Sequence, residues 1–235
     1  MPKEYNQNEI VEKIESVIRD NRIATLYKEP YIKRKGKTRD LGESYSEVVS
    51  EKLLVSNIKA LFSTQVKRIG RPDYKVEHKG KINEKSNRDE EILAIRLKNK
   101  DLKYLGRILE YQIPLKSSNF DKGIGKIDLV SISNKRDRVF IIELKAKNSI
   151  EGLLKGVLEI ATYALQLNQE KFLRDMHNPG KLISKAVLLE KGSQGYREAH
   201  ELDLRPNLKE LIKCLDVKLF LLENRTNYLV RNIAL

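Results

Sequence analysis

GKIDLV (residues 125–130) and FIIELK (residues 140–145) are the two segments that decide the fold of this chain. Both are short, apolar and bounded by polar residues, which is typical of β-strands. Each carries charge within its apolar run: Asp128 in the first segment, Glu143 and Lys145 in the second. Because burying a charge is costly unless it is paired or bound to a metal, these three residues need a chemical explanation.

The polar residues 133–138 (SNKRDR) that join the two segments predict an antiparallel hairpin. If it is centred between positions 135 and 136, facing residues have numbers that sum to 135 + 136 = 271. Asp128 then lies opposite Glu143, with Cβ atoms about 4.5–5.5 Å apart. Lys145 shares the face of Glu143, because side chains alternate along a strand. Two carboxylates so close repel each other unless a cation lies between them, and a hard divalent metal fits that place.

A solvated salt-bridge cluster is the alternative interpretation of the same residues. In this register Lys126 faces Lys145, so two acids and two lysines share one face of the hairpin. Surface ion pairs of this kind are common and contribute little to stability. The residues alone leave both interpretations open.

The order of these motifs resembles the PD-(D/E)XK nuclease superfamily, and most closely its RecB-like branch. There the first strand reads Gly-x-hydrophobic-Asp, as in residues 125–128, and the second ends in acid-x-Lys, as in residues 143–145. A helix with Gln-x-x-x-Tyr follows, and here residues 159–163 read Glu-Ile-Ala-Thr-Tyr. Glu159 departs from the family's glutamine, and a carboxylate would repel phosphate where an amide would not. The resemblance covers residues 88–192.

The resemblance implies an α/β fold: a restriction-endonuclease-like core with a central mixed β-sheet flanked by helices, a helical N-terminal extension and a C-terminal sheet extension. It implies that Asp128, Glu143 and the backbone carbonyl of Leu144 hold Mg²⁺ or Mn²⁺, which activates a water for attack on a phosphodiester. Lys145 would orient or deprotonate that water, or neutralise the phosphate. Its two acidic neighbours oppose the lowered pKa that a base needs, which favours the electrostatic role. The implied activity is a metal-dependent nuclease of the defence, restriction or repair type that acts above all on DNA, and many such nucleases act as homodimers. DNA or RNA as the substrate, and cleavage at ends or internally, both stay open at this point.

A further glutamate from a helix before the first core strand often completes such a site, and two predicted helices offer one. Residues 44–62 have apolar residues at helical spacing and offer Glu47. Residues 88–95 offer Glu91. Its neighbour Glu90 fits an ordinary interaction with the helix dipole.

The composition of the 235 residues limits the classes of partner. Lys and Arg number 46 against 33 Asp and Glu, a net charge of +13, which favours a polyanionic partner and above all nucleic acid. No apolar run approaches the length of a membrane span, and the N-terminus lacks a signal-peptide core. The single cysteine, Cys214, excludes an internal disulfide and is unsuited to a zinc site. We therefore expect a cytoplasmic protein with no membrane partner.

Basic residues interleaved with tyrosines are the candidates for contact with a phosphate backbone or with bases. Most lie in the run 27–39 and the loop 116–126, and for both segments an ordinary solvated loop is the alternative. The candidates are Lys33, Arg34, Lys35, Lys116, Lys122, Lys126 and, on the helix after the second strand, Tyr163.

Three regions follow one another along the chain. Residues 1–87 form a helical, basic N-terminal region that can supply the first core helix, residues 88–192 the nuclease core, and residues 193–235 an α/β extension of the same domain. The pattern further predicts a helix over 8–27, strands over 109–115, 125–133, 138–146, 185–190, 217–223 and 226–232, a helix capped by Asn148 or Ser149, and a helix after Pro206.

Two classes of function remain. A metal-dependent nuclease is favoured by the intact Asp128, Glu143 and Lys145. A catalytically inactive nucleic-acid-binding module with a nuclease-like fold is favoured by the departure at Glu159. Other chemistries find no support, because the histidines lack metal-ligand spacing and the sequence contains no Walker motif, nucleophile elbow or dinucleotide fingerprint.

Overall fold

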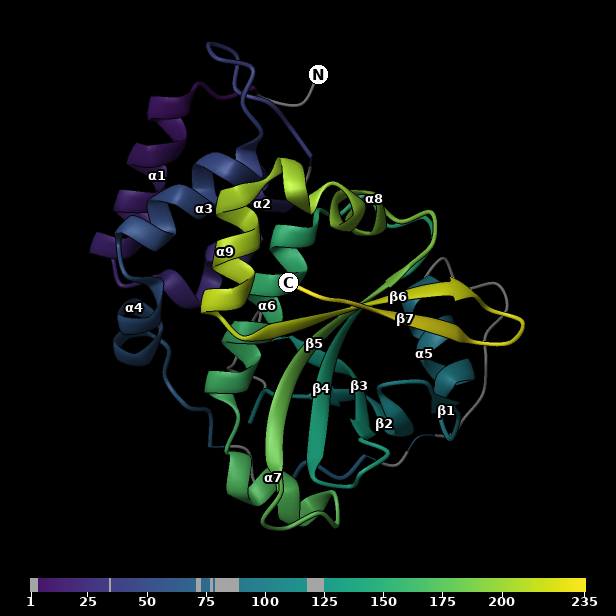
Figure 1. Ribbon diagram of the computed structural model, residues 1–235. Helices are drawn as coiled ribbons and strands as arrows, with labels where there is room; N and C mark the ends of the chain where they lie inside the picture. Colours follow the sequence, from purple (N-terminus) through teal and green to yellow (C-terminus); the bar gives the residue numbers. More distant parts are fainter. Residues whose placement is uncertain (1–3, 34, 71–72, 77, 79–88, 118–124) are drawn as a thin grey trace.

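A computed structural model describes residues 4–33, 35–70, 73–76, 78, 89–117 and 125–235. In these residues the chain forms a mixed α/β fold with one seven-stranded sheet flanked by helices (Figure 1). The strands follow one another across the sheet in sequence order: β1 (Asp101–Leu102), β2 (Gly106–Pro114), β3 (Lys126–Ile132), β4 (Arg138–Lys145), β5 (Leu182–Glu190), β6 (Val217–Asn224) and β7 (Leu229–Ile233).

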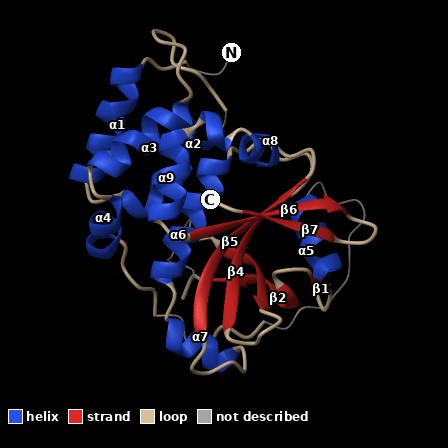
Figure 2. Ribbon diagram, in the orientation of Figure 1, coloured by secondary structure: helices blue, strands red, loops and turns tan. Residues whose placement is uncertain are grey.

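Helices cover both faces of this sheet, but unequally (Figure 2). They are α1 (Gln7–Arg19), α2 (Pro30–Lys33), α3 (Tyr45–Val55), α4 (Ile58–Gln65), α5 (Asp89–Leu97), α6 (Leu153–Gln166), α7 (Gln169–Asp175), α8 (Gln194–His200) and α9 (Pro206–Cys214), with two 3₁₀ turns, η1 (Ile23–Lys28) and η2 (Leu202–Leu204). The larger layer holds the N-terminal helices with α6 and α9, and it shares one hydrophobic core with the sheet. On the other face α5 packs against β2, β3 and β4.

The sheet changes from antiparallel to parallel pairing at its centre. Strands β1 to β4 form an antiparallel meander, β5 and β6 run parallel to β4, and β7 returns antiparallel to β6. Parallel neighbours need helical crossovers, which α6 and α7 supply between β4 and β5, and α8 and α9 between β5 and β6. Strand β4 is buried along nearly its whole length, and this explains its continuous apolar sequence.

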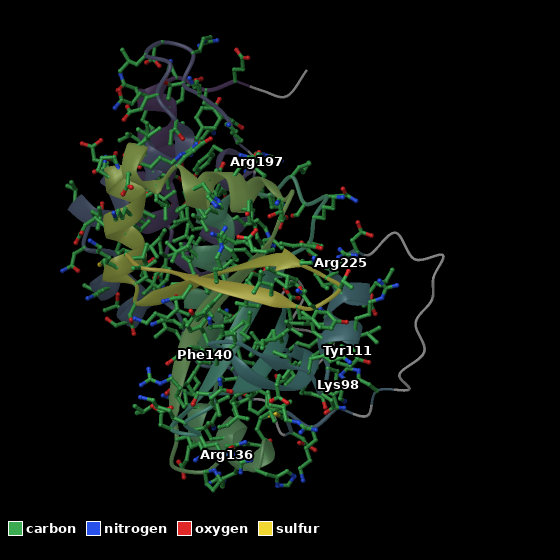
Figure 3. All side chains as sticks on the ribbon, turned by 45° about the vertical axis from the view of Figure 1, so that its right-hand side comes forward. Lys98, Tyr111, Arg136, Phe140, Arg197 and Arg225 are labelled. Carbon is green, nitrogen blue, oxygen red and sulfur yellow. The ribbon has the colours of Figure 1, made fainter. Side chains whose placement is uncertain are left out.

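The pairing of β3 with β4 confirms the predicted hairpin register. Leu129 faces Ile142, and the numbers of all four facing pairs sum to 271. Continued by one residue, this register places Asp128 opposite Glu143. The turn of the hairpin, marked by Arg136 in Figure 3, lies at the end of β4 away from these two acids.

Two predicted helices are interrupted where an asparagine enters the left-handed backbone region. The helix predicted over 8–27 ends at Arg19, because Asn21 takes a φ of 58° and the chain continues as η1. The helix predicted over 44–62 is split into α3 and α4 at Asn57, which has a φ of 54° and caps α4 with its side chain. Asparagine tolerates this region because its short polar side chain bonds to the nearby backbone.

The helix after β4 begins later than predicted. Neither Asn148 nor Ser149 caps it, since Gly152 is the N-cap and α6 begins at Leu153. The Leu153 N–H donates to the carboxylate of Glu198 at 2.7 Å, and this bond replaces the predicted cap. The loop between β4 and α6 is therefore longer than expected.

The C-terminal strands largely agree with the prediction. The strands predicted over 185–190 and 217–223 are β5 and β6, while β7 begins three residues after the predicted position 226. Helices α7 and α8 were not predicted. For residues 63–87 the sequence predicts a loop or a weak hairpin, and positions 71–72, 77 and 79–87 of this segment lie outside the described residues. Among the described helices, none is long and apolar enough to span a bilayer.

Candidate active site

Asp128 lies near the start of β3, where its carboxylate accepts two hydrogen bonds. The side-chain Nε2 of Gln112 on β2 donates to Oδ1 at 2.8 Å, and the backbone N–H of Leu144 on β4 donates to Oδ2 at 2.9 Å. The second bond ties the carboxylate to the strand of Glu143, as the register predicts. Gln112 itself has a φ of 49°, a strained conformation that is often found at functional sites.

The Asp128 carboxylate lines a pocket of about 490 Å³ between α5 and the ends of β3 and β4. Asn148 Nδ2 donates to Asp89 Oδ2 at 2.9 Å and thereby joins the loop after β4 to α5. Lys98 and Tyr111 mark the adjacent junction of α5 with β2 in Figure 3. Half of the lining residues are acids, and the full set is Asp89, Glu90, Glu91, Gln112, Asp128, Ala146, Asn148 and Ser149.

Glu143 and Lys145 lie beneath α6, where solvent barely reaches them. Glu143 is 4% exposed and Lys145 is 1% exposed. Lys145 Nζ donates to Glu143 Oε1 at 2.7 Å and to Glu151 Oε2 at 2.6 Å. Gly156 of α6 lies directly over these residues: a Cβ there would be in ordinary contact with Glu143 Cγ at 3.6 Å and Lys145 Cε at 3.7 Å, and in tighter contact with Val187 Cγ1 at 3.3 Å.

Helix α6 brings a second lysine to these residues. Lys155 Nζ lies 2.7 Å from Glu151 Oε2 and 2.6 Å from Glu159 Oε2. Lys145 Nζ lies 3.9 Å from the same oxygen of Glu159. Glu143, Lys145, Glu151, Lys155 and Glu159 therefore form one ion cluster, in which three carboxylates share two ammonium groups.

Tyr163, which was predicted to contact nucleic acid, is buried and supports Glu159 instead. Its hydroxyl donates to Glu159 Oε1 at 2.8 Å, and its ring packs edge-on against Tyr27 at 5.9 Å. The same hydroxyl explains the glycine before the Asp128 strand, because a Cβ at Gly125 would lie 1.7 Å from it. The first and third sequence motifs therefore meet in the structure.

Burial and neighbouring charges shift the proton affinity of each group. Burial raises the pKa of Asp128 to about 7, against the opposing effect of Lys145. Burial, with the charges of Asp128 and Glu159, raises the pKa of Glu143 well above its ordinary value. Burial acts on Glu159 in the same direction, but Lys145 and Lys155 outweigh it and lower the pKa of Glu159 to about 2. Although burial opposes it, the surrounding carboxylates raise the pKa of Lys145, so this side chain remains an ammonium at neutral pH.

These donors fit a hard divalent cation. Burial disfavours the ionised forms of both Asp128 and Glu143, and the charge of Asp128 further disfavours that of Glu143. A cation between the two carboxylates would relieve these effects. The described residues give each Asp128 oxygen one hydrogen bond, which leaves lone pairs for a metal. In the described part of the chain, no three His, Cys, Asp or Glu side chains converge as ready metal ligands. The cation would therefore rely on two carboxylates, a backbone carbonyl and water.

The structure gives Glu47 a helix-capping role in place of the predicted catalytic one. Its buried carboxylate accepts the N–H groups of Asn207 at 3.1 Å and Leu208 at 2.8 Å, at the start of α9. Unpaired N–H groups and the helix dipole make this a favourable place for a carboxylate. The helical acids that line the pocket come from α5 instead.

Of the two glutamates on α5 that line the pocket, Glu90 is the one that acts on the predicted site. Its charge adds to the burial that raises the pKa of Asp128, and it also acts on Lys145. Glu91, the predicted candidate, adds instead to the effect of burial on Tyr111. Glu90 is therefore a candidate for the third acid beside Glu91, since both line the pocket.

Four of the predicted nucleic-acid contacts are exposed lysines of the described residues. Lys116 follows β2, and Lys126 is the first residue of β3. The side chains of Lys33 and Lys35 are exposed near the loop before α6, where the Lys33 carbonyl accepts the Gly152 N–H at 3.1 Å. Two further candidates, Arg34 and Lys122, lie outside the described residues.

Gln112, Glu151 and Lys155 were not predicted as site residues, and Glu90 was assigned to an interaction with the helix dipole. The four-residue spacing of Glu151, Lys155 and Glu159 is a signal for ion pairing along one face of a helix. Gln112 gives no comparable signal, because its position depends on the pairing of β2 with β3.

Comparison with known proteins identifies no relative for this fold or this site. No family model matches the chain, and no curated protein or solved structure matches it.

Proposed function

We propose that this protein is a Mg²⁺-dependent nuclease that hydrolyses phosphodiester bonds in DNA. The observation that carries the proposal is the meeting of Asp128, Glu143 and Lys145 beside an acid-lined pocket. The net charge of +13 supports a polyanionic substrate. The antiparallel strands β2 to β4, followed by α6 and the parallel β5, support a restriction-endonuclease-like core.

Each residue has a separate role in this proposal. Asp128, Glu143 and the carbonyl of Leu144 would hold Mg²⁺ or Mn²⁺, which supplies an activated water and stabilises charge at the phosphate. Gln112 and the Leu144 N–H fix the orientation of the Asp128 carboxylate. Lys145 neutralises phosphate charge rather than accepting a proton, because the surrounding carboxylates keep it protonated despite its burial.

The direct test is cleavage of plasmid and linear DNA by the purified protein in Mg²⁺, in Mn²⁺ and in EDTA. We expect cleavage with either metal and none in EDTA. Asp128→Asn and Lys145→Met should each remove the activity, whereas Glu170→Gln should keep it, since Glu170 is an exposed partner of Arg174 on α7. Equal residual cleavage by both site variants would indicate a contaminating nuclease and would remove the basis of the proposal.

Glu90→Gln is expected to slow cleavage about 10–100-fold, the range found for groups that support a metal site from outside its ligands. Glu91→Gln should have a smaller effect, because the charge of Glu90, and not that of Glu91, is among the main influences on the pKa of Asp128. Both substitutions remove one negative charge from the same helical turn, so each is the control for the other. The measurement is the cleavage rate as a function of Mg²⁺ concentration, and equal losses would contradict the assignment of Glu90.

A catalytically inactive nucleic-acid-binding module is the second candidate. Two observations favour it: Glu143 and Lys145 are buried in ion pairs, and Glu159 stands where the related nucleases have glutamine. This function predicts DNA binding with no metal-dependent cleavage, in wild type and in Asp128→Asn alike.

A further inference from the structure

Glu151 is the member of the ion cluster that is most open to solvent. Its side chain is 29% exposed, against 2% for Lys145 and 9% for Lys155. It therefore lies between the two buried lysines and the solvent.

A single oxygen of Glu151 serves both lysines. Its Oε2 lies 2.6 Å from Lys145 Nζ and 2.7 Å from Lys155 Nζ. Two ammonium groups that converge on one oxyanion are a suitable seat for a phosphate oxygen, because charge-assisted hydrogen bonds to phosphate and to carboxylate have the same geometry at the donor. An anion that enters this seat from solvent must replace Glu151.

The Glu151 side chain can leave without loss of the surrounding structure. The loop that carries it is held by the bond of 3.1 Å from the Gly152 N–H to the Lys33 carbonyl. The hydrogen bonds that the described residues give its carboxylate come from the two lysines. After its departure Lys145 keeps Glu143, and Lys155 keeps its partner on α6, so neither ammonium is left without a counter-charge.

Further positive charge lies beside this seat. Lys28 ends η1 and Lys33 ends α2, and both of these elements pack against α6. A basic part of the N-terminal region therefore adjoins the helix that carries Lys155, and a polyanion is favoured there.

We propose that Lys145 and Lys155 form a phosphate-binding seat. In the free protein the carboxylate of Glu151 occupies this seat, and a backbone phosphate of the nucleic acid displaces it. Lys155 is then a substrate-binding residue that lies outside the matched sequence motifs, and Glu151 limits access to it. This inference rests on the proposed function, because it assigns the site a nucleic-acid substrate.

The test is the affinity for a short fluorescein-labelled DNA duplex, measured by fluorescence anisotropy in EDTA so that no cleavage is needed. Glu151→Gln should lower Kd about three- to tenfold, because the seat loses its internal competitor. Glu170→Gln removes the same charge from an exposed glutamate, and it should change Kd by less than about twofold. A Glu151→Gln variant that binds no more tightly than Glu170→Gln would overturn the inference.

Lys155→Met provides the second arm of this test. It should raise Kd about tenfold, and adding Glu151→Gln to it should recover little, because both act on the same seat. If Lys155→Met fails to fold, Lys155→Met with Glu159→Gln removes the buried pair as a unit and carries the same prediction. An equal gain from Glu151→Gln with and without Lys155 would count against the seat. If the protein does not cleave DNA in Mg²⁺ but the affinities follow the expected pattern, the proposed nuclease activity is rejected and the phosphate-binding seat is retained.

Discussion

Replacing Asp128 by asparagine is expected to abolish metal-dependent DNA cleavage and, in the same protein, to raise the melting temperature above neutral pH. The loss, about a thousandfold or more, follows because an amide cannot supply the charge that holds a divalent cation at the phosphate. The gain follows because burial raises the pKa of Asp128 to about 7, so its ionised carboxylate is unfavourable in the folded chain. Activity and stability should therefore change in opposite directions.

The increase in melting temperature caused by Asp128→Asn should itself grow with pH. Folded Asp128 keeps its proton up to a pKa of about 7, against an ordinary value of 3.8 in the unfolded chain. Between these values the folded state binds more protons, so this residue's contribution lowers wild-type stability as pH rises and levels off above about pH 7. Asparagine does not titrate, and the difference in melting temperature should be smallest near pH 4 and largest near pH 8.

Asp137→Asn is the matched control for this pH series. Asp137 lies in the turn before β4, where hydrogen bonds from Ser133 and Arg138 lower its pKa to about 2. Its carboxylate stabilises the fold above its unfolded pKa, so the amide should lower the melting temperature at neutral pH, the opposite sign to Asp128→Asn. Mg²⁺ should raise the melting temperature of the wild type and leave that of Asp128→Asn unchanged. If the difference in melting temperature between Asp128→Asn and the wild type does not grow with pH, the raised pKa of Asp128 is contradicted.

The part of the site that could be predicted from the sequence is local. The turn over residues 133–138 and the alternation of side chains define the register of β3 and β4, and the position of Asp128 opposite Glu143 follows from these two features. The motif at residues 159–163 lies on the helix that directly follows the strand of Lys145. The local sequence is therefore enough to predict its position.

The parts that were missed depend on contacts between distant segments. Glu47 looks like a catalytic candidate in its own helix, but its partners are backbone N–H groups of α9, about two thirds of the chain away. Gln112 becomes a partner of Asp128 only through the pairing of β2 with β3. The helix predicted over 44–62 was wrong for a different reason, since the conformation of a single residue, Asn57, outweighs the apolar periodicity.

Lys145→Met is expected to lower the free energy of unfolding by about 3–5 kcal/mol, because it leaves buried carboxylates without their positive partner. For a chain of this size the melting temperature should fall by about 6–20 °C. Lys209→Met removes a lysine that is paired with the exposed Asp203, and it should cost less than about 1 kcal/mol. Thermal and urea unfolding of the two variants measure the contrast.

Combining Lys145→Met with Glu143→Gln should recover part of that stability, because the double substitution removes both members of a buried pair. Cleavage should remain absent in the double variant, since two of the three charged groups of the site are gone. Recovery of stability without recovery of activity would show that the ion pair supports the fold and the reaction by separate means. A double variant no more stable than Lys145→Met would instead mean that Lys145 is stabilised mainly by Glu151 and Glu159, and that Glu143 contributes little to its burial.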